Sequence, residues 1–276
     1  PLLTMIDKIN LSEELFNKFA DLFYRFSGIK LKDYKKYLVE YRLSKFVGAS
    51  RPYKTYEEFY DALVKDLSGE LRKGFIQVLT TNYTYFFREG MHFEFLKNYL
   101  SKNYLSMEYI RLWSAGCSTG EEAYSMAITA LETIPNLDAY DFKILATDIS
   151  NSVLNFAIEG IYHFSKIKGS LDDKILRKYF IFDKTKKTFK VKDEVKKFIA
   201  FRYLNIMDKY PFNRKFDIVF LRNVLIYFDN SEKEYILRKI YDYVKDGGYL
   251  ILGLSESIVG IKSPFKSIKN SIYVKE

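Results

Sequence analysis

The hydrophobic pattern of the first 80 or so residues is helical. After Ser12, which suits the start of a helix, apolar side chains recur at helical spacing as far as Gly28, which suits its end. A second predicted helix has four large side chains on one face: Tyr34, Tyr37, Leu38 and Tyr41. A third is predicted to start at Thr55, with Glu58 as its capping-box partner, and a fourth spans 70–79. No strand pattern occurs in this part, so we expect a small all-helical domain.

Beyond about residue 108 the pattern changes to strands that alternate with helices. Runs rich in β-branched and aromatic residues predict strands over 109–114, 142–146, 198–204, 216–221 and 249–254. The helices between them are predicted over 121–133, 152–158 and 231–244, the last closed by Asp246-Gly247-Gly248. Such alternation predicts an α/β fold with a parallel, doubly wound sheet covered on both faces. Residues 265–274 are expected to add one or two antiparallel edge strands.

Two segments interrupt this alternation. Residues 80–84 are all hydroxyl or amide residues, which compete for backbone hydrogen bonds and do not continue a helix, so they predict a linker. Residues 179–182 and 188–191 flank a polar turn and indicate a hairpin. We therefore expect three parts: a helical domain over 1–80, a linker with a helix over 81–105, and an α/β domain over 106–276 that contains a small β-subdomain at about 166–197.

Composition narrows the class of protein. The chain is 48% hydrophobic and 18% aromatic, which excludes intrinsic disorder, collagen-like repeats and coiled-coil rods. One cysteine and two histidines provide neither an internal disulfide nor a Cys/His metal site, so no metal is expected. No segment approaches the roughly 20 apolar residues that a membrane span requires. These features predict a cytoplasmic protein without direct membrane insertion.

The formal net charge of +9 is concentrated in two segments. Residues 25–54 hold nine basic and two acidic side chains, and residues 166–202 hold thirteen and five. Lysine-rich surfaces often serve only solubility, whereas a concentrated excess also suits docking to an acidic partner. Both interpretations remain open on charge alone.

Candidate chemistry follows the first predicted strand. The segment there is small and polar: Ser114-Ala115-Gly116-Cys117-Ser118-Thr119-Gly120-Glu121-Glu122. Small residues such as Gly116 let the backbone approach a ligand closely, although an ordinary strand-to-helix turn has the same composition. The two carboxylates suit the start of a helix but would repel a pyrophosphate. A cationic, phosphate-free cofactor fits this segment better.

The second predicted α/β strand, over 142–146, is followed by Asp148, which suits hydrogen bonding to the ribose hydroxyls of an adenosine group. The alternative role for Asp148 is to cap the following helix. The glycine turn and this acid together favour adenosine, and the chain lacks the Gly-Lys-Ser/Thr of a phosphate-binding loop. Adenosine without phosphates indicates S-adenosylmethionine.

A third polar site follows the strand over 216–221, which runs directly into Arg222 and Asn223. Such groups are costly to hold near a core without partners, so we expect them to face a site. Tyr227, a few residues on, is either part of that site or a packing aromatic.

Taken in order, these segments resemble the chemotaxis-receptor glutamate O-methyltransferases, the CheR family. The resemblance covers nearly the whole chain and rests on TTN and FFRE within 80–89, WSA and STGEE within 113–122, TDI at 147–149, RNV and IYFD within 222–229, and GLSES at 253–257. It implies a helical N-terminal domain, a linker, and a Rossmann-like methyltransferase domain with an inserted β-subdomain. Leu254 stands where the family frequently has histidine, and we assign it no role.

The resemblance also implies roles for individual residues. Residues implied to bind S-adenosylmethionine, and its product S-adenosylhomocysteine, are Asn82, Thr84, Arg88, Gly116, Glu122, Asp148, Asn205, Ile206, Arg222 and Asn223. Arg88 and Tyr227 would lie nearest the transferred methyl group and are the implied catalytic residues. The implied partner is the helical cytoplasmic region of a chemotaxis receptor, whose clustered glutamates would meet Lys35, Lys36, Arg42 and Lys45. Some family members also bind a receptor tail peptide through the β-subdomain.

Two other functions remain as alternatives. A nucleic-acid methyltransferase would share the basic charge, but it would normally need a polar-Pro-Pro-aromatic loop or a catalytic cysteine, and here the corresponding loop is Arg222-Asn223-Val224-Leu225. We therefore expect no nucleic-acid partner. A sensor that binds S-adenosylmethionine without transferring its methyl group is the other alternative, against which the presence of both Arg88 and Tyr227 argues.

Overall fold

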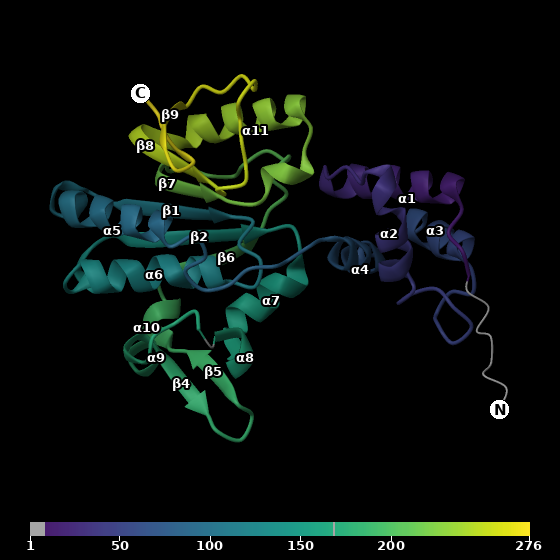
Figure 1. Cartoon of the computed structure of the whole chain (residues 1–276), viewed down its shortest axis with the longest axis horizontal. Coiled ribbons are helices and arrows are strands. Elements are labelled where there is room, and N and C mark those ends of the chain that lie inside the picture. The colour runs from purple at the N-terminus through teal and green to yellow at the C-terminus, as the bar shows by residue number, and fades with distance from the viewer. Residues whose placement is uncertain (1–8, 168) are drawn as a thin grey trace. The chain divides into compact units, whose positions relative to one another are not determined.

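The computed structural model describes residues 9–167 and 169–276. The chain divides into two compact units, one that ends at Thr81 and one that begins at Asn82 (Figure 1).

The N-terminal unit is helical, as its hydrophobic pattern predicts. Its helices are α1 (Glu13–Ser27), the short 3-10 turn η1 (Asp33–Lys35), α2 (Lys36–Leu43), α3 (Tyr56–Val64) and α4 (Glu70–Leu79). The Ser12 side chain accepts a hydrogen bond from the backbone of Leu15, and Gly28 ends α1 with a φ of 73°. The core of this unit is aromatic, with Phe19 in contact with Phe59 and Phe75.

The cap of α3 differs in detail from the prediction. Thr55 Oγ1 accepts from the backbone nitrogen of Glu58 at 3.2 Å, as a helix cap should. The Glu58 carboxylate, however, accepts from the nitrogen of Lys54 at 2.7 Å, one residue before the cap. Glu58 therefore binds the amide one residue before the one that a capping box would satisfy.

The four large side chains predicted to share one helix face do not form a buried stripe. Tyr34 lies in η1, before α2 begins, and it is 76% exposed, while Tyr37 is 73% exposed. The buried side chains of α2 are instead Val39, Glu40 and Leu43. Spacing predicts which residues share a face, but it does not decide which face meets the core.

The C-terminal unit is built on a seven-stranded sheet. Its strands are β1 (Ile110–Ala115), β2 (Phe142–Asp148), β6 (Ile199–Tyr203), β7 (Phe216–Leu221), β8 (Val244–Leu252), β9 (Lys266–Lys269) and β10 (Ile272–Val274). They lie in the order β6-β2-β1-β7-β8-β10-β9. The first five are parallel, and β10 is antiparallel to both β8 and β9. The predicted doubly wound sheet and its antiparallel strands near the C-terminus are thus confirmed.

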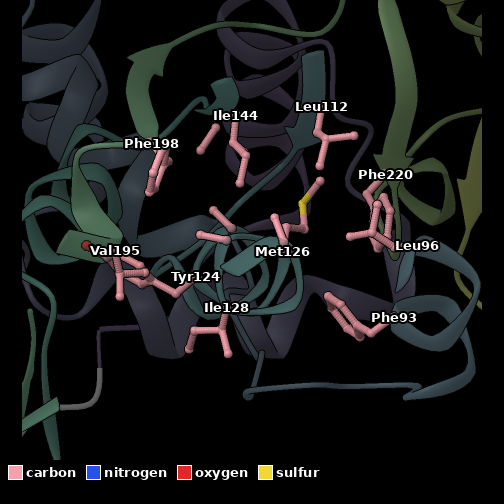
Figure 2. Close-up of a cluster of buried hydrophobic side chains, with 14 of the residues drawn as sticks. Phe93, Leu96, Leu112, Tyr124, Met126, Ile128, Ile144, Val195, Phe198 and Phe220 are labelled. Atoms are coloured by element: carbon pink, nitrogen blue, oxygen red, sulfur yellow. The ribbon is translucent and has the colours of Figure 1, made fainter. Parts of the chain in front are cut away.

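Helices cover both faces of this sheet (Figure 1). The helices α5 (Met91–Asn103), α6 (Glu121–Thr133) and α7 (Asn151–Glu159) lie on one face, and α11 (Asn230–Tyr243) lies on the other. Figure 2 shows Phe93 and Leu96 of α5 and Met126 of α6 beside Leu112 and Phe220 of the sheet. Every residue of β7 is buried, which explains its continuous apolar sequence. None of the helices within residues 9–167 and 169–276 has the length and apolar character to cross a membrane.

The helix predicted over 231–244 is confirmed as α11, but the role predicted for the glycine pair is wrong. The pair was expected to close the helix, whereas α11 ends at Tyr243 and β8 starts at once with Val244. Gly247 then has a φ of 73° within the strand, and its nitrogen donates to Lys275 O at 2.8 Å. A Cβ on Gly248 would lie 2.8 Å from Asp217 O. The glycines therefore permit an irregular strand and a close backbone approach, rather than a loop.

A small antiparallel sheet lies between α7 and β6 in the sequence. It consists of β3 (Ile161–His163), β5 (Thr188–Val191) and β4 (Phe180–Asp183), in that order. β4 and β5 form the hairpin that the sequence predicts. Three short helices accompany it: α8 (Phe164–Ile167), α9 (Asp173–Tyr179) and α10 (Asp193–Lys196). The sheet includes β3 as well, which precedes the segment expected to form the subdomain.

Candidate cofactor and active site

The strand order places the candidate residues at one edge of the large sheet. On one side of β1 the chain continues through β2 and β6, whereas β7 and β8 lie on the other side. This reversal makes the carboxyl ends of β1 and β7 the switch point at which ligands bind in open α/β sheets. The segments after β1, β2 and β7 carry Gly116, Asp148 and Arg222, so the fold brings these predicted residues to the same edge.

The turn after β1 leaves few free amides. The nitrogens of Gly116 and Cys117 both donate to Thr147 O at 2.8 Å, and the nitrogen of Gly120 donates to Cys117 O at 3.0 Å. The nitrogen of Ser118 donates to the Asp148 carboxylate at 2.9 Å. A phosphate-binding loop needs such amides to point at its ligand. In this turn they hold the turn itself together.

Gly116 has a conformation and surroundings that exclude a side chain. Its φ is 81°, and a Cβ built there would lie 2.5 Å from Cγ2 of Val224, in the segment after β7. The turn after β1 and the segment after β7 thus approach each other within a distance that only glycine permits.

Asp148 is buried at the end of β2 and is held by backbone amides. Its Oδ2 accepts from Ser118 N and its Oδ1 accepts from Ser150 N, each at 2.9 Å. Burial raises the pKa of Asp148, while these two hydrogen bonds act in the opposite direction. Ser118 also donates from Oγ to Asn82 O at 3.0 Å, which ties the start of the linker to the same turn.

The buried side chain of Arg222 connects three parts of the site. Its Nε donates to Glu122 Oε2 at 2.8 Å, and Glu122 Oε1 accepts from Ser114 Oγ at 2.7 Å. Its Nη1 donates to the backbone oxygen of Arg88 at 2.6 Å and contacts His92 Nδ1 at 3.0 Å. The Arg222 side chain is only 2% exposed. Through these hydrogen bonds the Arg222 side chain joins the linker to α6 and, by way of Glu122, to β1.

Asn223 and the segment after it are organised by Glu256. Asn223 has a φ of 60°, and its nitrogen donates to Glu256 Oε2 at 2.7 Å. The same carboxylate accepts from Gly253 N at 2.8 Å and Ile226 N at 3.3 Å. Burial raises the pKa of Glu256. Tyr227 follows in the 3-10 turn η4 (Leu225–Tyr227) and is partly exposed.

The linker has no helix between α4 and α5, as predicted, and its candidate residues differ in their surroundings. The side chain of Arg88 donates from Nη1 to Tyr83 O at 3.1 Å and lies 5.8 Å from the Tyr83 ring centre and 5.9 Å from that of Tyr85. Thr84 is partly exposed. The backbone of Arg88 is therefore fixed by Arg222, while its partly exposed guanidinium lies against two aromatic rings.

The segment after β6 carries the last two candidate cofactor residues. Asn205 is buried, and its Oδ1 accepts from Met207 N at 3.0 Å. The backbone nitrogen of Leu204 donates to Asp148 O at 3.0 Å, which places this segment beside the end of β2. Ile206 O accepts from Lys239 Nζ of α11 at 2.8 Å.

The charge of this edge fits S-adenosylmethionine. Three carboxylates are buried around the turn, at Glu121, Glu122 and Asp148, and the buried cation beside them is Arg222. A sulfonium group is attracted by such an acidic surplus, whereas phosphates are repelled. The amides of the turn are paired within it, which leaves few N–H groups for a phosphate and supports the same distinction. The carboxylates and paired amides present here therefore suit a cationic nucleoside.

The four candidate docking residues belong to the N-terminal unit. Lys36 forms an ion pair with Glu13 at 2.8 Å. Arg42 donates to Leu79 O at 2.8 Å and to Thr81 Oγ1 at 3.2 Å, so it caps the end of α4. Lys45 is exposed and Lys35 is partly exposed. The structure thus gives Arg42 an internal role that the sequence did not indicate.

Three residues of the site escaped prediction from the sequence. Glu256 belongs to the GLSES motif of the family resemblance, whereas the residues around His92 and Lys239 give no local pattern that predicts a role. Each contacts a segment far away in the sequence, such as His92 with Arg222 and Glu256 with Asn223. A local pattern carries no signal for such partners. The glutamate in GLSES was the one available sign, because it lies in a loop of otherwise small residues.

The fold and this edge define a class of protein, the S-adenosylmethionine-dependent methyltransferases. Comparison with known families agrees: residues 14–80 match the all-alpha domain of the CheR methyltransferases, and residues 82–274 match their S-adenosylmethionine-binding domain. The chain belongs to the CheR methyltransferase family and is an S-adenosylmethionine-dependent enzyme, as the sequence resemblance predicts.

Individual relatives support this assignment over nearly the full chain. A chemotaxis protein methyltransferase of Borreliella burgdorferi is 40% identical, with 92% of each chain covered. A probable chemotaxis protein methyltransferase of Rhizobium etli is 36% identical over 91% of this chain and 96% of its own. A chemotaxis protein methyltransferase of Salmonella typhimurium is 34% identical over 99% of this chain and 93% of its own.

Proposed function

We propose that this protein transfers the methyl group of S-adenosylmethionine to glutamate side chains of chemotaxis receptors, in the cytoplasm. The observation that carries the proposal is the acidic, amide-paired turn after β1, in a chain whose relatives are named chemotaxis protein methyltransferases. A transferase for carboxylates needs no group that removes a proton, because a glutamate side chain is already ionised at pH 7.

The reaction requires alignment more than acid–base chemistry. Bound S-adenosylmethionine supplies a methyl group whose bond to sulfur breaks as a bond to the glutamate oxygen forms, leaving a methyl ester and S-adenosylhomocysteine. The residues of this chain hold the reactants in line and keep water away. Asp148 and Asn205 are proposed to bind the nucleoside, and the carboxylates near Glu122 favour the positive charge.

Arg88 and Tyr227 are the proposed catalytic residues. Arg88 has a partly exposed guanidinium on a backbone fixed by Arg222, so it can bind an incoming carboxylate with charge-assisted hydrogen bonds. Tyr227 has a partly exposed phenol in the segment after β7 and can orient the carboxylate or the methyl donor.

Radiolabelled methyl transfer to receptor fragments tests the proposal. Fragments with their clustered glutamates intact should gain base-labile label, and fragments with these glutamates changed to alanine should gain none. Arg88→Ala should lower kcat at least a hundredfold, whereas Arg214→Ala, which breaks an exposed ion pair with Asp141 at the opposite edge of the sheet, should not. Cofactor binding without any transfer would instead support a sensor.

The basic segment 25–54 is proposed to dock the acidic methylation region through Lys35, Lys36, Arg42 and Lys45. Because Arg42 also caps α4, its replacement is expected to disturb the N-terminal unit as well as docking. Lys45, which is exposed, is the cleaner test. Lys45→Glu should raise KM for the receptor fragment without changing kcat, and an unchanged KM would remove Lys45 from the docking surface.

A receptor tail peptide is proposed to bind the small sheet. β4 is an edge strand, and Ile181 and Phe182 on it are exposed. An extended peptide can add to such an edge through backbone hydrogen bonds, with specificity from side-chain contacts. Titration with the tail peptide should give saturable binding that Ile181→Asp weakens. Binding that is unaffected by this change would place the tail elsewhere.

A further inference from the structure

His92 is a fully buried histidine with a defined partner on each side. Its Nε2 lies 2.8 Å from the backbone oxygen of Asn270, between β9 and β10, and its Nδ1 lies 3.0 Å from Arg222 Nη1. Its side chain is 0% exposed. It therefore links α5 to two segments that are far from it in the sequence.

These partners fix the protonation state of the ring. A backbone oxygen can only accept, so Nε2 must carry the proton, and a guanidinium can only donate, so Nδ1 must offer its lone pair. His92 is thus neutral and acts as an acceptor for Arg222. Burial lowers the pKa of His92, which favours the same neutral state.

The Nη1 atom that His92 binds is the one that holds the linker. Nη1 also donates to the backbone oxygen of Arg88 at 2.6 Å, while Nε is engaged by Glu122. His92 and Glu122 therefore anchor the guanidinium from two directions. With the guanidinium fixed, the backbone of Arg88 is fixed as well.

We propose that His92 is a positioning residue for methyl transfer, whose neutral Nδ1 holds Arg222 against the backbone of Arg88 and so places the Arg88 side chain. This inference rests on the proposed function of Arg88. It predicts that the acceptor at Nδ1 matters for kcat, whereas the donor at Nε2 matters mainly for stability.

Two substitutions separate these contacts. His92→Asn keeps an amide oxygen near the position of Nδ1, where it can accept from Arg222, but loses the bond to Asn270. His92→Gln can keep a donor near Nε2 but removes the acceptor at Nδ1. Because a lost hydrogen bond to a charged group typically costs about a factor of ten or more, kcat of His92→Gln should be about tenfold below that of His92→Asn.

Several measurements distinguish positioning from a merely structural role. Assays are run well below the melting temperatures of both variants, with exposed His163→Asn as the histidine control. The dissociation constant for S-adenosylmethionine should differ between the two His92 variants by less than kcat does, because the nucleoside contacts proposed for Asp148 and Asn205 do not involve His92. If kcat instead follows melting temperature in both variants, the contact is structural and the inference is wrong.

The pH profile gives an independent readout. The groups that face His92 are Arg222, the Glu89 carboxylate at 3.4 Å from Nδ1, and the Asn270 carbonyl. A proton on Nδ1 would turn this atom towards Glu89 and end its bond to Arg222. Because burial lowers the pKa of His92, the wild-type kcat should fall only below the usual titration range of histidine, and more steeply there than that of His92→Asn.

Identical acid limbs in these two proteins would overturn the inference while leaving receptor methylation intact. Absence of methyl transfer by the wild-type protein would remove the proposed function, and this inference with it.

Discussion

Glu122 and Arg222 form a buried ion pair at the edge of the sheet where the cofactor is proposed to bind. Their atoms approach to 2.8 Å, with 9% and 2% of the side chains exposed. Desolvating two charges is costly, so such a pair is tolerated only when further hydrogen bonds satisfy both partners. Ser114 supplies one to Glu122, and the Arg88 carbonyl and His92 supply others to Arg222.

Removal of the Glu122 carboxylate should therefore destabilise the protein strongly. We expect Glu122→Ala to lower the free energy of unfolding by about 3 kcal/mol, because it removes the nearer of the two carboxylates beside the buried Arg222 guanidinium and leaves only Glu89, at 3.5 Å. Glu122→Gln keeps an acceptor for Arg222 and should lose less than half as much. Chemical denaturation of the two variants checks this, and equal losses would show that charge compensation is unimportant here.

Gly116 illustrates a second residue-scale constraint. Gly116→Ala combines a positive φ with a Cβ 2.5 Å from Val224 Cγ2, and should cost about 2–4 kcal/mol. Gly260 has a similar φ of 78° but nothing within 4 Å of a Cβ, so Gly260→Ala isolates the backbone cost, about 1–2 kcal/mol. Unfolding curves should also show that adding Val224→Ala to Gly116→Ala recovers part of the free energy of unfolding that Gly116→Ala loses. No recovery would mean that the steric contact is relieved in another way.

At the scale of elements, the sequence correctly predicted the helices and strands whose ends and burial depend on their own residues. The cap of α1, the ends of α4 and the buried run of β7 follow from the residues that form them. The predicted start of β8 was wrong, because a Gly-Gly pair indicates a loop unless another part of the chain approaches closely. Here the backbone oxygens of Asp217 and Lys275 make that close approach, which the local sequence does not reveal. The exposed face of η1 and α2 was likewise undecided by spacing, because only tertiary packing selects the buried face.

Lys239 of α11 shows how an element can support a site that it does not line. Its Nζ donates to Ile206 O and Asp208 O, each at 2.8 Å, and lies 4.3 Å from the ring centre of Tyr210 and 4.6 Å from that of Tyr235. The lysine thereby holds the segment after β6. Burial lowers the pKa of Lys239 to about 8.

The affinity for S-adenosylmethionine should therefore decline as the pH rises through about 8. Below this pH the charged amine holds both carbonyls, and above it the neutral amine holds them less strongly. Lys239→Met should weaken binding about tenfold at pH 7, since charge-assisted hydrogen bonds are lost, and should remove this pH dependence. Lys239→Arg stays charged and should bind at pH 9 as at pH 7. Calorimetric titration at both values measures this, and a flat wild-type profile would contradict it.

At the scale of the whole molecule, the sequence located the segments of the site but not the contacts among their side chains. Ser118 and Asp148 are joined by a hydrogen bond, as their places after two predicted strands suggested. Asn82, whose role only the family resemblance implied, accepts from Ser118 Oγ. His92 and Lys239 could not be found in this way. Their roles depend on partners 130 and 33 residues away, and no local periodicity records such distances.

The uneven charge of the molecule predicts how receptor binding responds to salt. Docking through residues 25–54 would be screened over a Debye length of about 8 Å at physiological ionic strength. Affinity for a receptor fragment should fall steeply as sodium chloride increases, while affinity for S-adenosylmethionine, which is proposed to bind next to buried carboxylates, should change little. Surface plasmon resonance at several salt concentrations tests this. Receptor binding that is insensitive to salt would argue against electrostatic docking.

The most direct test of receptor glutamate methylation is to map the methyl group by mass spectrometry. The wild-type protein, S-adenosylmethionine and a receptor cytoplasmic fragment are incubated together, and the receptor peptides are sequenced before and after mild base. Glutamate O-methylation predicts one added methyl group on individual glutamate side chains, lost in base and strongly reduced with Arg88→Ala. A methyl group on another residue type, or a base-stable one, would contradict glutamate O-methylation.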